Sequence, residues 1–362
     1  MQTLTKEKQL LAKNTLDSFY EAIQRKQKVI PFDANFYFTK GEPGRVTGYL
    51  LREVALEEEV VHWLNSRVKF QQVMQRYKKY DYRLASLDWP AHFATRFINV
   101  TGQAATNCEN IFMFFPEVLG LKTDNLEDYF GFEFIDMWVS VFDEIIFPCT
   151  RRVFDKDSQF ELYATLRPML EKTIYLASVF HEIGHRCGYW KVSSTVDSRI
   201  SINKFHTDVL GELATDTLLV NFLPEFRELQ YFIFLQRLFW FGRFGFKDNP
   251  RNGKLNNDND TWIGAYLWNQ YIEKSVLTQN SDETWNVDFN KLGTVFSSIL
   301  DDIDKLGEVL ILNSKGLHDE LVYQWMINRV ILKNNKFCYS STMKDALKHC
   351  INVAEKPLNK YQ

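Results

Sequence analysis

The sequence predicts a mainly α-helical protein with a small β element in its N-terminal third. Three observations support this fold class. Apolar residues recur at the spacing of one helical face over most of the 362 residues. Glycine and proline are scarce, at 16 and 9 residues, and no glycine-rich phosphate loop is present. An extended pattern is confined to Pro31–Tyr49, where phenylalanines precede the turn Gly41–Gly44.

Helical periodicity begins near the N-terminus, where Leu16, Phe19 and Ile23 fall on one side of a predicted helix. A later segment is apolar on almost all of its surface, which indicates burial between neighbouring elements, and Pro148 is expected to end it. The elements expected in this half are a helix over Thr5–Gln27, a short hairpin over Pro31–Tyr49, helix over Leu50–Leu87, a mixed segment over Trp89–Leu121 and the apolar helix Leu126–Phe147.

The second half is expected to be helical, with two polar connections. Asp155, Asp157 and Glu161 alternate before it, and we interpret them as a helix cap in preference to a calcium site. The expected helices are Leu170–Tyr189, Thr207–Val220, Glu228–Phe246, Thr261–Leu277, Asp288–Leu312, Ser314–Leu332 and Thr342–Ala354, and the connections are Lys191–Phe205 and Asp248–Asp260.

Composition excludes several classes of protein. The net charge of −3 and the pI near 6.2 do not indicate a nucleic-acid-binding protein. The aromatic segment Glu228–Phe246 is interrupted by charged residues such as Arg237, so we do not expect it to enter a membrane. The first 27 residues lack the apolar core of a signal peptide, and the five cysteines lack the spacing of a disulfide framework. We therefore expect a cytoplasmic protein with reduced thiols.

The most informative stretch is His181-Glu182-Ile183-Gly184-His185, which has the form H-E-x-x-H. Two histidines at i and i+4 lie on the same helical face, one turn apart, so both rings can reach one metal ion. Zinc is the metal expected from this motif, and Glu182 between the histidines is a candidate general base. The alternative is an ordinary helix with two packed or solvated histidines. Glycines at 184 and 188 favour close packing or access over helix strength.

A catalytic zinc needs a third protein ligand. The metzincin signature would place it three residues after Gly188, but Lys191 stands there and cannot bind a metal while protonated. Downstream, Glu212 and Asp216 share one face of the predicted helix Thr207–Val220, with Thr207 as its N-cap. Glu212 suits the metal and Asp216 suits the outer ring N–H of a ligand histidine, whereas two solvated acids are the alternative.

Other residues near this motif are weaker ligand candidates. His206 and Asp208 precede Glu212 and are fallback ligands. Cys187 lies two residues past the second histidine, a spacing that points away from the metal-facing side of a helix, so we expect it to be a packing residue.

H-E-x-x-H followed by a helix with E-x-x-x-D resembles the gluzincin group of zinc metallopeptidases, the thermolysin-like and neprilysin-like enzymes. The resemblance covers only about residues 179–218. It implies that His181, His185 and Glu212 are zinc ligands. It also implies that Glu182 is the general base and that Asp216 supports a ligand histidine without binding the metal itself.

The resemblance also implies a two-lobed metallopeptidase-like fold with the metal helix between the lobes. By this analogy the N-terminal, mostly helical lobe is 1–157, and 158–362 is the helical lobe that carries both motif helices; a single domain is the alternative. Enzymes of this group use a downstream histidine or tyrosine to stabilise the oxyanion, and four residues are open candidates: Tyr231, Tyr266, Tyr271 and His318.

The function expected from these residues is zinc-dependent hydrolysis of a peptide or another amide by metal-activated water, with a peptide or small amide-containing molecule as substrate. Two alternatives stay open: a zinc enzyme that acts on a small metabolite in a biosynthetic pathway, and a non-enzymatic helical binding protein. The oligomeric state is not indicated by the sequence.

Overall fold

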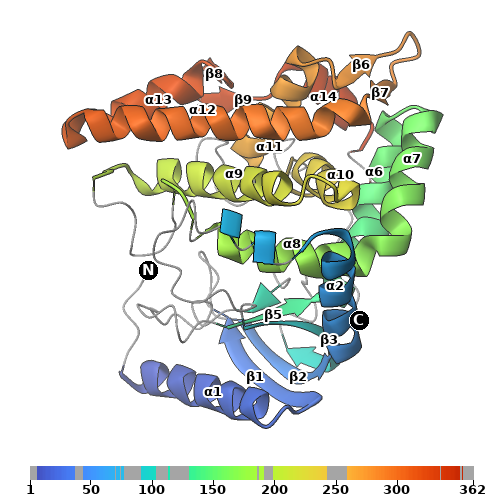
Figure 1. Ribbon diagram of the computed structural model, residues 1–362, viewed down its shortest axis with the longest axis vertical. Coiled ribbons are helices and arrows are strands. Elements are labelled where there is room, and N and C mark those ends of the chain that lie inside the picture. Colours follow the sequence, from blue (N-terminus) through green and yellow to red (C-terminus); the bar gives the residue numbers. More distant parts are fainter. Residues whose placement is uncertain are drawn as a thin grey trace.

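The computed structural model describes residues 6–36, 44–69, 71–73, 75–76, 91–102, 113–114, 130–185, 187–190, 199–242, 259–334, 336–350 and 353. Helices predominate throughout these residues, and the largest sheet is built from N-terminal segments (Figure 1). The predicted fold class, mainly α with a small β element in the N-terminal third, is confirmed.

The sheet has five strands in the order β1-β2-β3-β5-β4. The predicted hairpin is present, with β1 and β2 antiparallel and Val29 paired with Leu51, whereas β3 and β5 are parallel. Ile30, Phe32 and Ala34 are buried and alternate with exposed residues, which is why this segment is a strand. The strands are β1 (Val29–Phe36), β2 (Gly44–Arg52), β3 (His92–Gly102), β4 (Met113–Phe114) and β5 (Gly131–Phe134).

Phenylalanines form the core between the sheet and the first helix, α1 (Lys6–Gln24). Phe19 of α1 stacks on Phe32, with ring centroids 5.3 Å apart, and meets Phe132 edge-on at 5.5 Å. Aromatic pairs in these geometries contribute roughly 0.5–1.5 kcal/mol each beyond their buried area. The high phenylalanine content is thus partly explained by this layer.

The helix predicted over Leu126–Phe147 is wrong in its described first part, because Gly131–Phe134 is the parallel strand β5. All four of these residues are buried, and Phe132 and Phe134 alternate with Gly131 and Glu133 at the period of a strand. The prediction missed this short alternation because the apolar segment that follows it is helical. Pro148 does not end the helical segment, which continues to Val153. The proline lies in the first turn of α6 (Phe147–Val153), where a missing N–H is tolerated.

The remaining helices stack in layers on the sheet (Figure 1). α8 lies between the sheet-bearing part and α9, and α12 covers α9 on its far side. The helices of the stack are α2 (Val54–Arg67), α8 (Leu170–Gly184), α9 (Lys204–Phe222), α10 (Arg227–Leu235), the π-helix η6 (Gln236–Phe241), α11 (Asn259–Glu273) and α12 (Leu292–Leu312).

Shorter elements surround this stack. They are α5 (Ile135–Val141), the π-helix η4 (Phe142–Ile146), α7 (Lys156–Leu166), η5 (Arg167–Met169), β6 (Leu277–Gln279), β7 (Trp285–Val287), η9 (Phe289–Lys291), η10 (Lys315–Leu317), α13 (His318–Ile327), β8 (Ile331–Lys333), β9 (Lys336–Cys338) and α14 (Ser341–Lys348). Among the residues described here, no helix is both long and apolar enough to cross a membrane.

Several helix boundaries differ from the prediction. The helix predicted from Leu50 begins only at Val54, because β2 continues to Arg52, and the predicted helices that end at Leu277 and Leu332 stop earlier, because those residues lie in β6 and β8. α8 ends at Gly184 rather than Tyr189, and Gly188 takes a left-handed conformation with φ of 71°. Both glycines weaken the helix there. α9 begins at Lys204, because Asn203 is the N-cap and its side chain accepts from the backbone N–H of His206 at 3.0 Å; Thr207 is not the cap.

Asp155 is the N-cap of α7 and accepts from the backbone N–H of Ser158, so the predicted helix cap is confirmed. The same carboxylate accepts from Asn280 and Asn286, next to and within the β6–β7 hairpin. The division into lobes 1–157 and 158–362 stays a prediction.

One carboxyl group on α12 makes stability depend on pH. Burial, together with repulsion from Asp301 and Glu308, raises the pKa of Asp304 to about 6. The folded state therefore binds this proton more tightly than the unfolded chain, so stability falls as pH rises from about 4 to 6. Asp304→Asn is expected to be more stable than the wild type at pH 7.5 by about 1 kcal/mol, a value reduced because the group is partly exposed.

Urea denaturation at pH 7.5 and pH 4 checks this expectation, because the difference between the two proteins should vanish at pH 4. Glu58→Gln, at an exposed position of α2, is the matched control and should be neutral at both pH values. An equal stability of Asp304→Asn and the wild type at pH 7.5 would contradict the prediction.

Candidate metal centre

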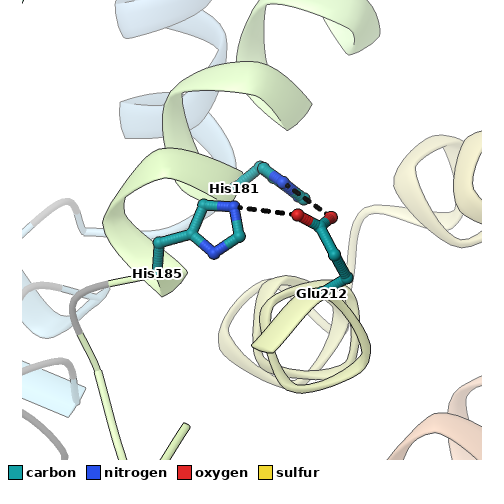
Figure 2. Close-up of side chains that lie close together, drawn as sticks. All are labelled: His181, His185 and Glu212. Atoms are coloured by element: carbon teal, nitrogen blue, oxygen red, sulfur yellow. Dashed lines mark ion pairs between the residues drawn. The ribbon is translucent and has the colours of Figure 1, made fainter. Parts of the chain in front are cut away.

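The candidate metal centre lies between α8 and α9. His181 and His185 come from the last turn of α8 and its C-cap, and Glu212 comes from the middle of α9 (Figure 2). One potential ligand atom from each residue lies within 4.8 Å of the others. The described structure therefore brings together the three residues that the sequence predicted as a set.

Two distances in this cluster are close to those between neighbouring ligands of a tetrahedral ion. His181 Nε2 is 3.4 Å from one carboxylate oxygen of Glu212, and His185 Nε2 is 3.5 Å from the other (Figure 2). Zinc bonds to nitrogen and oxygen near 2.0–2.1 Å imply an edge of about 3.3 Å between neighbouring ligands of a tetrahedron. The donor set and its spacing thus fit zinc.

The three side chains of this cluster are partly exposed. The side chains of His181, His185 and Glu212 are 21%, 17% and 24% exposed. A structural zinc site closes all four positions, whereas a catalytic one leaves a position for water. The partial exposure fits the second kind.

Side chains of α9 orient the outer nitrogen of each ring. His181 Nδ1 lies 3.4 Å from a carboxylate oxygen of Asp216, and His185 Nδ1 lies 3.2 Å from the hydroxyl of Thr215. That hydroxyl donates to the Gly211 carbonyl at 2.9 Å, so it accepts from the histidine. These partners favour the tautomer with the proton on Nδ1, which leaves Nε2 of a neutral ring available to a metal.

Thr215 is a residue that the sequence interpretation missed. It lies three residues after Glu212, so helical spacing placed the two on one side of the helix. That spacing was the available signal, but a threonine in an apolar helix is ordinary and did not stand out.

Gly184 permits the close approach of α8 and α9 at this point. A Cβ atom at residue 184 would lie 2.8 Å from Thr215 Cγ2 and 3.2 Å from Thr215 Cα. Any larger residue would push the two helices apart. The glycine inside H-E-x-x-H therefore allows Thr215 to reach His185.

A buried arginine lies behind the carboxylates. Arg237 of η6 is 2% exposed and donates from Nε to Asp216 at 2.5 Å, from Nη1 to Asp260 at 2.5 Å and from Nη2 to Glu212 at 3.2 Å. Its guanidinium also lies over the ring of Phe241. The sequence offered one signal of this. Arg237 stands among aromatic and aliphatic residues, and a cation that is buried among them needs charged or polar partners.

The charges of the cluster shift its pKa values. Burial raises the pKa of Glu212, but the positive charges of His185, His181 and Arg237 outweigh it and lower that pKa overall. Burial opposes the charge on His181, yet Glu212 and Asp216 raise its pKa well above the ordinary value. The pKa of His185 is lowered, with burial as the main cause. The cluster thus keeps Glu212 ionised, as a ligand carboxylate must be.

Glu182 is buried in the last turn of α8, at 8% exposure. Its negative charge is among those that favour the charged form of His185, which shows that it lies near the histidine pair. The fallback ligands lie elsewhere: His206 Nδ1 is 2.8 Å from Asp319, and Asp208 forms an ion pair with Lys204. Cys187 is buried, and its thiol donates to the Ile183 carbonyl. Lys191 lies outside the described residues.

The four candidates for oxyanion stabilisation differ from one another in their surroundings. Tyr231 donates to Glu161, and His318 accepts from the Ser201 backbone N–H. Tyr266 lines a polar cavity of about 480 Å³ between α11 and α12. The hydroxyl of Tyr271 is buried near the charges of Asp216 and Arg237.

No family model and no curated protein matches this sequence. Solved structures with a similar fold include the following two. The structure of DPP III from Caldithrix abyssi has a TM-score of 0.56 and 12% identity, over 92% of this chain and 60% of that one. The structure of dipeptidyl-peptidase III from Corallococcus sp. strain EGB has a TM-score of 0.55 and 11% identity, over 99% and 66%. This chain thus spans about three fifths to two thirds of the length of those proteins.

The contact at Gly184 generates a prediction. Gly184→Ala should lose about 1–3 kcal/mol of stability, because its Cβ would press against the backbone of Thr215. Gly293→Ala is the matched control, since a Cβ there would meet the Gln230 amide at an ordinary 3.5 Å. Thermal and urea denaturation of both variants measure the difference. Equal stability of the two would show that α8 and α9 do not depend on this glycine.

Proposed function

We propose that this protein is a zinc-dependent peptidase or amide hydrolase, with His181, His185 and Glu212 as metal ligands. The observation that carries the proposal is the spacing of two imidazole Nε2 atoms and one carboxylate at 3.4 and 3.5 Å, in a partly exposed site. The likeness in fold to two proteins named as dipeptidyl-peptidase III supports the peptidase class. The proposed substrate is therefore a peptide or a small molecule with an amide bond.

The residues of the site have separable roles in this proposal. Zinc, when bound, supplies a Lewis acid that lowers the pKa of water and polarises the substrate carbonyl. Glu182 accepts a proton from the water while the oxygen of that water bonds to the carbonyl carbon of the substrate. Glu182 then gives that proton to the leaving nitrogen as the C–N bond breaks. Thr215 and Asp216 keep the two histidines in the required tautomer and orientation.

The test of the proposal is metal content followed by product analysis. Protein purified without chelators is analysed for its elements, and about one zinc per chain is expected. Incubation with a peptide library, read by mass spectrometry, should then yield cleaved products that a chelator abolishes. A protein that neither contains nor takes up zinc would overturn the proposal. Turnover of small metabolites without peptide cleavage would instead favour the biosynthetic alternative.

Glu182→Gln tests the general base. The variant is expected to bind zinc as the wild type does and to lose roughly 10²–10⁴-fold in turnover, since glutamine cannot accept the proton. Glu171→Gln is the control, because this residue lies at the start of the same helix and pairs with Arg96. Zinc stoichiometry and kcat are the measurements. Full activity of Glu182→Gln would remove this residue from the proposed chemistry.

Replacing one ligand residue at a time tests the three proposed metal ligands. His185→Ala and Glu212→Ala are each expected to lose most of the bound zinc, because two protein ligands hold the ion far less tightly than three. His206→Gln is the matched control, since His206 faces Asp319 rather than the proposed ligands. Zinc per chain after dialysis distinguishes them. A Glu212→Ala protein with full zinc occupancy would disprove the third ligand.

A further inference from the structure

Arg237 uses its three guanidinium nitrogens on three different carboxylates. Nε binds Asp216, Nη1 binds Asp260 and Nη2 binds Glu212. Two of these carboxylates belong to the face of α9 that meets the histidines, and Asp260 begins the neighbouring helix α11. The planar guanidinium group of Arg237 therefore links Glu212 and Asp216 to α11, a third element of the fold.

The two oxygens of Glu212 have different surroundings. Oε2 lies 3.2 Å from Arg237 Nη2 and 3.4 Å from His181 Nε2. Oε1 lies 3.5 Å from His185 Nε2. A donor that engages one oxygen of a carboxylate sets the rotation of the group and leaves the other oxygen available to a metal.

We propose that Arg237 is a positioning residue of the metal centre: by holding Oε2 of Glu212 and Oδ2 of Asp216, it makes Glu212 a one-oxygen ligand. This inference rests on the proposed metal-dependent function. A carboxylate that ligates through one oxygen keeps the coordination number low, which leaves room for water and substrate.

Charge and orientation make opposite predictions for the loss of Arg237. The guanidinium is a buried cation close to the site of a divalent cation, so its charge alone opposes metal binding. If charge were its only effect, a neutral residue at 237 would tighten zinc binding. If Arg237 positions the carboxylates, the same substitution frees Glu212 and Asp216 and weakens zinc binding, by about tenfold or more.

The experiment compares Arg237→Gln and Arg237→Lys with the wild type, using zinc titration and the visible absorption of the cobalt(II)-loaded proteins. Lysine keeps the positive charge but lacks the planar guanidinium group with its several N–H donors. Both variants are expected to bind zinc about tenfold or more weakly. Their cobalt bands should be less intense than those of the wild type, because Glu212 can then ligate through both oxygens and raise the coordination number.

Arg329→Gln is the matched control. Arg329 forms its ion pair with Asp302 rather than with a proposed ligand, so the zinc affinity and the cobalt spectrum should stay as in the wild type. Circular dichroism establishes that each variant is folded. If Arg237→Gln does not fold, the double variant Arg237→Gln/Asp260→Asn, which leaves the net charge unchanged, and the charge-preserving Arg237→Lys carry the test.

Unchanged or tighter zinc binding by Arg237→Gln would overturn the inference. So would an Arg237→Lys protein that matches the wild type in both zinc affinity and cobalt spectrum, because the planar guanidinium group would then be dispensable. These results would leave the proposed function intact, because the wild type would still bind the metal. A wild type that binds neither zinc nor cobalt would overturn the metal centre itself, and this inference with it.

Discussion

The arrangement of the candidate site depends on the close approach of α8 and α9 at Gly184. A side chain there would collide with Cγ2 of Thr215 and press on its Cα, so the absence of a Cβ allows the observed distance between the helices. Once they are this close, residues of α9 reach both faces of the histidine pair: Glu212 faces the Nε2 atoms, and Thr215 and Asp216 face the Nδ1 atoms. A helix pair even slightly further apart would lose several of these short contacts together.

Close packing of acids and histidines creates an electrostatic cost that the surrounding helices offset. Asp216 is 2% exposed, and a buried carboxylate without a partner is strongly unfavourable. Arg237 supplies the partner from η6, a π-helical segment whose other side chains are largely buried and aromatic. The site therefore requires three layers of the fold at once: α8, α9 and the η6–α11 pair. This requirement explains why a small chemical centre is surrounded by such an extensive helical core.

How much was predictable differs from element to element. Apolar periodicity predicted the helices α8 and α9 but not their exact ends. For α9, Asn203 and Thr207 are both good N-cap residues, and only the contacts of the fold select between them. The strand at Gly131–Phe134 was predicted as helix, because it is only four residues long and continues directly into the apolar helix α5, so that its alternation of Phe132 and Phe134 with Gly131 and Glu133 was overlooked. For the site, His181, His185 and Glu212 were predicted as a set and lie together; their role as metal ligands stays a prediction. Arg237 stands out in the sequence only as a charge that interrupts an apolar segment.

By itself, the sequence determined the helical class of the protein and the local geometry of H-E-x-x-H, because i and i+4 positions share a helical face whatever surrounds them. It also placed Glu212 and Asp216 on one face of a second helix for the same reason. Only the tertiary structure decided which rotation of the second helix meets the histidines, how close it comes and which cation balances its carboxylates. Those properties depend on contacts between residues far apart in the chain, such as Gly184 with Thr215 and Arg237 with Asp216, and no local periodicity encodes them.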